Sequence, residues 1–298
     1  MSRASFLALL VMTGLCILAF AGNSLLARAA LADGQMDAMT FTAVRVMGGA
    51  FALAVLAALR DRGRFKQWAD GVLPGKADVL GVVALGLYMA GFSAAYGGID
   101  AASGALILFA VVQVVVLGWG IVRGDRPTGT QCGGVVLALA GLVYLLAPSA
   151  EVRALWPVCW MIAAGAGWGA YTLLGRSAGD PLARTTRNFV GAVPLGLAML
   201  LLGSPGDSTA GAYGLAIVSG AVTSGLGYAL WYRTVPRLSV TASGVSQLLV
   251  PPVTALLAAV LLAEPVSWRL GIASVVTLAG VGLAIRGGKK QTPSRDSR

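Results

Sequence analysis

Charged residues are scarce in this chain of 298 residues, at 11% against roughly 25% in ordinary soluble domains. Hydrophobic residues make up 57% of the sequence, and a further 41 residues are glycine. A soluble fold with one core cannot bury this much apolar surface, and the composition also excludes a disordered chain and a disulfide scaffold. The sequence therefore predicts a polytopic membrane protein.

Histidine is absent, which excludes a Ser-His-Asp triad, a histidine metal site and a histidine proton relay. The three cysteines, Cys16, Cys132 and Cys159, lie far apart in apolar segments, without the CxxC spacing of metal and redox sites. We expect them to serve as small apolar packing residues. We therefore expect no catalytic residues, no cofactor and no metal ion.

Ten apolar segments are long enough to cross a bilayer, which takes about 20 residues of helix. They cover residues 5–27, 38–59, 78–98, 101–122, 129–147, 156–176, 187–203, 210–232, 240–262 and 268–286. The first resembles a secretory signal with a cleavage-like Ala19-Phe20-Ala21, but its apolar run continues to Leu26, so we expect a retained helix. The predicted fold is an all-α membrane protein with ten transmembrane helices.

Basic residues give the chain a formal net charge of +10 and are distributed unevenly between its loops. If the N-terminus is cytoplasmic, all but four of the 22 Lys and Arg residues fall in cytoplasmic segments. The four exceptions are Arg28, Arg45, Arg153 and Arg269. This asymmetry follows the positive-inside rule and predicts that both termini are cytoplasmic. It also explains the positive charge without a nucleic-acid partner.

Short matches relate the two halves of the chain. Residues 23–28 (NSLLAR) match 171–176 (YTLLGR), 45–50 (RVMGGA) match 187–192 (RNFVGA), and LAG at 139–141 recurs at 278–280. Each half holds five predicted spans, and an odd number makes the second half enter the membrane from the opposite side. We predict two inverted repeats, 1–148 and 149–298 with a short basic tail, as in many secondary transporters. A scaffold or enzyme that grew by duplication is the alternative.

The second half carries a family signature. Residues 224–233 (SGLGYALWYR) and 239–265 (SVTASGVSQLLVPPVTALLAAVLLAEP) resemble the last helices of the EamA branch of the drug/metabolite transporter superfamily. Within that branch, the chain length and Trp231-Tyr232-Arg233 are most similar to YddG-type amino-acid exporters. The resemblance implies a multi-pass transporter of the bacterial inner membrane, monomeric or homodimeric, that exports amino acids, aromatic ones included, or similar small metabolites.

Substrates of inverted-repeat transporters bind near the bilayer midplane, between the halves. No acidic or basic residue stands at the centre of a predicted span, so we expect an uncharged cavity, which disfavours phosphate-bearing substrates and a carboxylate proton relay. The expected substrate-binding residues are Tyr88, Tyr96, Gln113, Trp168, Tyr171, Tyr228, Ser243 and Gln247. Aromatic rings attract an ammonium group, and hydroxyls and amides bind a carboxylate.

Two consecutive prolines, Pro251 and Pro252, interrupt the ninth span. Each removes a backbone donor, so the carbonyls of Gln247 and Leu248, four residues earlier, lose their partners. The pattern predicts a kink beside Gln247, acting either as a hinge or as a structural bend alone. Glu264 precedes the last helix and is expected to cap it or to form part of a hinge.

Three other functions remain open at this stage. One is export of drugs or other metabolites by a member of the same superfamily. A membrane-embedded lipid enzyme is a second, although no cluster of nucleophile, base and metal ligands is present. A passive channel is a third, and saturable, competable flux would distinguish a transporter from it.

Overall fold

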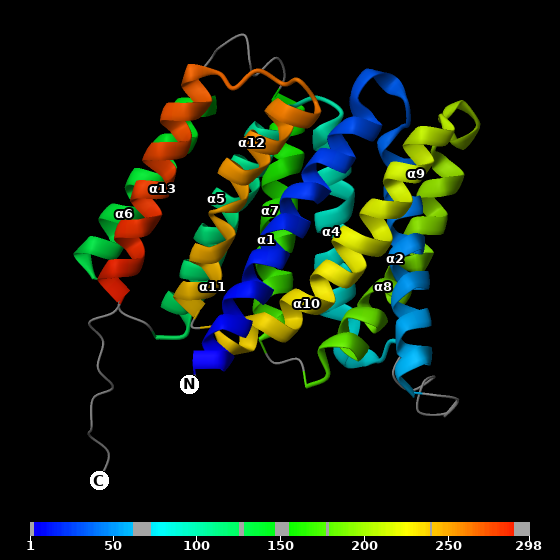
Figure 1. Cartoon of the computed structure of the whole chain (residues 1–298), viewed down its shortest axis with the longest axis horizontal. Coiled ribbons are helices and arrows are strands. Elements are labelled where there is room, and N and C mark those ends of the chain that lie inside the picture. The colour runs from blue at the N-terminus through cyan, green and yellow to red at the C-terminus, as the bar shows by residue number, and fades with distance from the viewer. Residues whose placement is uncertain are drawn as a thin grey trace.

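The computed structural model describes residues 3–61, 73–124, 128–146, 155–176, 179–238 and 240–288, which form an all-helical bundle (Figure 1). The first half contributes α1 (Arg3–Leu31), α2 (Ala38–Asp61), α4 (Val79–Tyr96), α5 (Ala101–Val122) and α6 (Gly129–Leu146). The second half contributes α7 (Leu155–Gly175), α8 (Pro181–Leu202), α9 (Ala210–Val218), α10 (Gly227–Thr234), α11 (Val240–Gln247), α12 (Val250–Leu261) and α13 (Trp268–Gly288).

Every predicted span corresponds to helix in the structure. Among the described residues, seven helical stretches are long and apolar enough to cross a membrane, the last of them being the continuous run Ala210–Arg237. The other three predicted spans, represented by α6, α11 with α12, and α13, contain shorter apolar helices. The structure thus supports a helical membrane protein, and ten complete crossings stay a prediction.

The predicted start of the seventh span, residue 187, is wrong. The helix begins at Pro181, because the side chain of Asp180 accepts a hydrogen bond from the Ala183 N–H and a proline fits the first helical turn. Arg184 and Arg187 therefore lie inside α8. Both pair with the buried Asp78 beside the start of α4, at N–O distances of 3.2 and 3.0 Å. Tertiary ion pairs thus allow two charges in the first turns of this helix.

The bundle has two ends, which we call the lower and upper faces as they stand in Figure 1. The lower face is where α1 begins and α13 ends, and the upper face is where α1 ends and α13 begins. Large apolar side chains cover the outside of the bundle between them, such as Phe51, Leu201 and Val275, which are 73%, 85% and 67% exposed. Such a surface suits contact with lipid rather than water.

Helices α6 and α13 lie side by side, apart from the main body of the bundle (Figure 1). Glycines make their backbones meet: a Cβ added at Gly134 would overlap the backbone of α13 at Ala284, and one added at Gly280 would overlap α6 at Ala138. Small residues allow such close approach in membranes, where van der Waals packing and interhelical hydrogen bonds join helices. One helix of each half thus forms an interlocked pair.

Two of the predicted spans have irregular backbones. The ninth is broken between Gln247 and Val250, and Pro251 and Pro252 occupy the first turn of α12, where their missing N–H groups are tolerated. The predicted kink is therefore confirmed. The eighth span is continuous, but Ser219–Leu226 forms a π-helical segment between α9 and α10. Such segments are rare and often mark functional sites.

Candidate functional site

A charged side chain occupies the middle of the bundle. Arg45 lies seven residues after α2 begins, and it is 0% exposed. Its Nε donates to the Ser224 hydroxyl at 2.9 Å, and its Nη2 donates to the hydroxyls of Tyr88 and Tyr228 at 3.0 and 2.8 Å. The guanidinium carbon also lies 4.6 Å from the ring centroid of Phe92. Hydroxyl dipoles and aromatic faces thus surround the cation.

Asn23 extends this polar network from α1. Its Nδ2 donates to the hydroxyls of Tyr88 and Tyr228 at 3.0 and 3.2 Å. Its Oδ1 accepts from the hydroxyls of Ser219 and Thr223 at 2.7 and 3.0 Å. Both hydroxyls belong to the π-helical segment, whose altered register turns several small polar residues toward the same side chain.

Close contact between α2 and the π-helical segment depends on Gly220. A Cβ at this position would overlap the carbonyl of Arg45. The glycine lets the two backbones touch, which brings the Arg45 side chain within reach of Ser224 in the next turn.

Aromatic rings cover the polar network. The ring centroid of Trp168 lies 5.0 Å from that of Tyr88, 4.6 Å from that of Tyr228 and 5.1 Å from that of Phe20. Tyr171 stacks on Trp168 at 5.6 Å. These rings come from α1, α4, α7 and α10, so both halves of the chain build the cluster.

Two further predicted residues, Gln247 and Ser243, join the cluster through hydrogen bonds. Trp168 Nε1 donates to Gln247 Oε1 at 2.6 Å, and Gln247 Nε2 donates to the carbonyl of Ser243 at 3.0 Å. Gln113 of α5 instead donates to the carbonyl of Gly244 at 2.7 Å, so it supports α11. Side-chain amides thus connect the ninth span to α7 through Gln247 and to α5 through Gln113.

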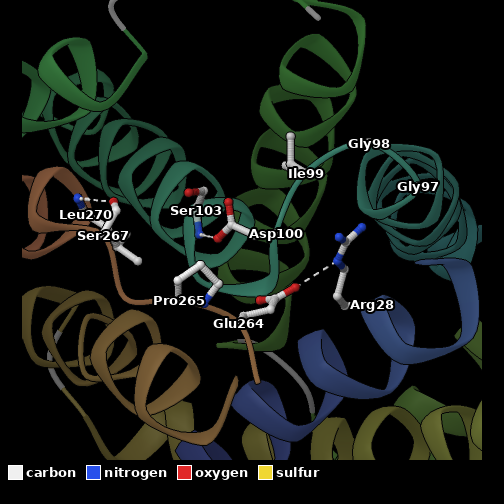
Figure 2. Close-up of a pocket in the computed structure, with 10 residues that line it drawn as sticks. All are labelled: Arg28, Gly97, Gly98, Ile99, Asp100, Ser103, Glu264, Pro265, Ser267 and Leu270. Atoms are coloured by element: carbon white, nitrogen blue, oxygen red, sulfur yellow. Dashed lines mark hydrogen bonds and ion pairs between the residues drawn. The ribbon is translucent and has the colours of Figure 1, made fainter. Parts of the chain in front are cut away.

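Tyr96 lies between the cluster and the upper face. Its ring packs edge-on against Phe92 at 4.6 Å, and its hydroxyl donates to the carbonyl of Ala101 at 3.2 Å. Its own carbonyl accepts from Arg28 Nη1 at 3.3 Å. Arg28 also pairs with Glu264 at 2.8 Å (Figure 2). Glu264 therefore pairs with α1 instead of capping the last helix, and the contact ties α1 to the segment between α12 and α13.

The Arg28–Glu264 pair lines a cavity of about 500 Å³ at the upper face (Figure 2). The remaining lining residues come from the segments that join α4 to α5 and α12 to α13 and from the first turns of α5 and α13: Gly97, Gly98, Ile99, Asp100, Ser103, Pro265, Ser267 and Leu270. Glu264 also accepts a hydrogen bond from the Ala101 N–H, at the start of α5, at 3.0 Å. One carboxylate thus connects three elements at this end of the bundle.

A second cavity, of about 660 Å³, lies at the lower face. Its walls come from the end of α2, the start of α8 and from α10, and they include Tyr232 and the ion pair Arg60–Asp180, with an N–O distance of 2.7 Å. Tyr232 stacks on Tyr171 at 4.7 Å and donates to its carbonyl at 3.0 Å. The cluster thus contacts the walls of a cavity at each face, through Tyr96 on one side and Tyr232 on the other.

The expectation of an uncharged site is wrong, because Arg45 stands in its centre. The basic-residue count placed Arg45 in an outside segment, whereas the structure buries it inside α2. Sequence reasoning also missed Asn23 and the hydroxyls of the π-helical segment. A signal was present for two of them: Asn23 and Arg45 each open one of the matched motifs, and Asn23 corresponds to Tyr171, which lies in the same cluster.

Comparison with known proteins agrees with this architecture. Residues 155–286 match the EamA-like transporter family. An uncharacterized protein of Pseudomonas aeruginosa is 45% identical over 278 residues, covering 93% of this chain and 94% of its own length. One solved crystal structure covers 98% of this chain and 100% of its own with a TM-score of 0.70 at 21% identity, which shows a shared fold. This chain therefore belongs to the EamA-like transporter family of the drug/metabolite transporter superfamily, whose members are in general not enzymes, and it is a multi-pass membrane transporter of small molecules.

Proposed function

We propose that the protein exports amino acids, or similar small metabolites, across the bacterial inner membrane by alternating access between two inverted halves. One observation carries the proposal: the buried aromatic and polar cluster is built from both halves and contacts the walls of a cavity at each face. A site between two halves that rock against each other can be opened to one side at a time.

The chemistry of the cluster suits an amino acid. The faces of Trp168, Tyr171 and Tyr228 attract an ammonium group, and they offer apolar contact to a side chain. The amide of Gln247 and the tyrosine hydroxyls are hydrogen-bond partners for the polar end of the substrate. Large apolar side chains of the substrate fit such a lining better than strongly hydrated ones.

Uptake of labelled amino acids into proteoliposomes tests the proposal, first with all common amino acids and then, for the best, with and without a pH gradient. Saturable uptake that competes with unlabelled substrate is the expected result. Absence of uptake for every amino acid, from protein shown to be folded, would refute the amino-acid assignment and leave the transporter family standing.

Two variants connect the transport to this cluster. Gln247→Ala leaves the buried indole N–H of Trp168 without its acceptor at 2.6 Å, and an unsatisfied buried donor costs about 1–3 kcal/mol. We expect uptake to fall by about tenfold. Trp168→Ala should lower it further, whereas the matched control Trp156→Ala, at a side chain that is 68% exposed, should leave uptake unchanged.

A further inference from the structure

The buried guanidinium of Arg45 has hydrogen-bonding capacity that the protein does not use. Its Nε and Nη2 have partners, but Nη1 is buried with no hydrogen-bond partner among the described residues. A buried donor of this kind is normally satisfied, and a buried charged donor even more so. The unused donor group therefore indicates that something other than protein completes the site.

Arg45 also lacks a counter-charge. No carboxylate of the described chain lies within 4.0 Å of it, although Arg28, Arg60, Arg184 and Arg187 all form ion pairs with acidic residues. Its partners are the neutral hydroxyls of serine and tyrosine and the faces of aromatic rings. A cation buried at membrane depth is costly and is retained for function. The site thus holds one uncompensated positive charge.

We infer that Arg45 is the anchor for a carboxylate of the substrate, so that the transporter accepts small carboxylates, zwitterionic or anionic, and rejects compounds of net positive charge. A guanidinium and a carboxylate form strong charge-assisted hydrogen bonds, with a planar fork that matches both oxygens. A cationic substrate would instead meet a like charge in a site of low dielectric.

The inference rests on the proposed function, whose substrate class it narrows. The aromatic rings by themselves would favour a cation, because ammonium groups bind well over such faces. Arg45 already lies over the rings of Tyr88 and Phe92, with its guanidinium carbon 5.2 and 4.6 Å from their centroids. The guanidinium of Arg45 therefore already covers part of this aromatic surface. Its positive charge would repel a second cation, which disfavours lipophilic cationic drugs as substrates.

Four compounds of matched shape provide the test: L-phenylalanine, L-phenylalaninamide, 3-phenyllactate and phenethylamine. Phenylalanine carries both a carboxylate and an ammonium group, phenyllactate carries a carboxylate alone, and phenylalaninamide and phenethylamine carry an ammonium group alone. Dissociation constants come from the ligand-induced rise in the unfolding temperature of the purified full-length protein. We expect the two carboxylates to bind at least about tenfold more tightly than the amide and the amine, as fits a charge-assisted hydrogen bond.

Variants separate recognition from structural support. Arg45→Gln should remove the preference for phenylalanine over phenylalaninamide, and Arg45→Lys should restore part of it through the remaining charge. Arg123→Gln removes a guanidinium that lies over Trp119 at the far end of α5 and should keep the full preference. If Arg45 only held the tyrosines in place, its loss would weaken all four compounds equally and leave the ratio unchanged.

The outcomes distinguish the two proposals. Equal binding of phenylalanine and its amide by the wild-type protein overturns the carboxylate inference while the amino-acid assignment stands. Binding of phenyllactate without phenylalanine supports the inference, and the uptake of the other amino acids then decides the amino-acid assignment. If none of the four compounds binds, and acetate and lactate also fail to bind, the carboxylate inference is overturned, while the amino-acid assignment is overturned only if the uptake scan also finds no amino acid.

Discussion

Substituting Glu264 by glutamine removes the ion pair that joins the halves at the upper face, and the structure sets the size of the effect. The pair has an N–O distance of 2.8 Å, with side chains that are 26% and 16% exposed. Exposed pairs contribute about 0–1 kcal/mol, and removing one partner of a fully buried pair costs about 3–5 kcal/mol. The Arg28–Glu264 pair lies between these limits, at about 1–2 kcal/mol.

If the pair closes the upper face, its loss shifts the equilibrium from molecules that are closed at this face toward molecules that are open there. A change of about 1.4 kcal/mol is tenfold in an equilibrium constant, so Glu264→Gln should raise the upper-open population by roughly five- to thirtyfold. The glutamine still offers an oxygen to the Ala101 N–H, which bonds to the second carboxylate oxygen at 3.0 Å. The substitution therefore removes the charge and keeps the cap of α5.

Thiol labelling measures the opening. Ser24 is 2% exposed and lies one helical turn before Arg28, toward the cluster, so Ser24→Cys reports access beneath the ion pair. The background carries Cys132→Ala and Cys159→Ala, because both natural cysteines are exposed, while Cys16 is buried. We expect Glu264→Gln to raise the labelling rate with a membrane-impermeant reagent by the same five- to thirtyfold.

The matched control breaks an ion pair at the other face. Asp180→Asn removes the ion pair between Asp180 and Arg60, whose N–O distance is 2.7 Å, and it should leave the labelling rate of the Ser24→Cys protein unchanged or lower. A labelling rate for Glu264→Gln within twofold of the parent, in protein that unfolds at the same temperature, would refute the view that the pair closes the upper face.

Two further predictions concern α2, one its contact with the π-helical segment and the other the hydrogen bonds at its N-terminus. Gly220→Ala should lower transport by at least about tenfold and destabilise the protein by about 1–3 kcal/mol, because the added methyl overlaps the α2 backbone, whereas Gly214→Ala, with open space around it, should change neither. Asp37 is partly buried, which raises its pKa, but hydrogen bonds from Thr40, Ser204 and Met39 outweigh this and hold the pKa below its ordinary value. The stability it contributes is therefore present above the unfolded-state pKa and lost as pH falls through the lower folded value, so the unfolding temperature of wild type should approach that of Asp37→Asn as the pH falls below about 4. A constant difference between the two proteins across that range would contradict the assignment.

Most of the fold was predictable from the sequence because membrane spans follow from length and apolarity. The predicted span 101–122 coincides with α5, and the paired prolines gave the break after Gln247. The start of α8 was not predictable by the same rule, since Arg184 and Arg187 enter the helix only because Asp78 neutralises them from another element.

The site was predictable in part. Periodicity and residue type found Tyr88, Trp168, Tyr228 and Gln247, which do come together. Arg45 was not predicted as a site residue, because a charged side chain in the outer part of a span can reach either outward to the membrane interface or inward to the bundle. Sequence spacing does not distinguish the two directions. Arg45 reaches inward because α2 packs against the π-helical segment. The local sequence pattern does not predict a π-helical segment at this place.

The interlocked pair of α6 and α13 also has a consequence for synthesis. Helix α6 ends at Leu146, but its partner begins only at Trp268, near the end of the chain. During translation α6 is therefore made before α13, and its glycine face lacks its partner helix while the rest of the second half is inserted. The α6–α13 contact therefore forms only after the other described helices have been made, so a chain truncated before Trp268 would leave the glycine face of α6 without its partner helix.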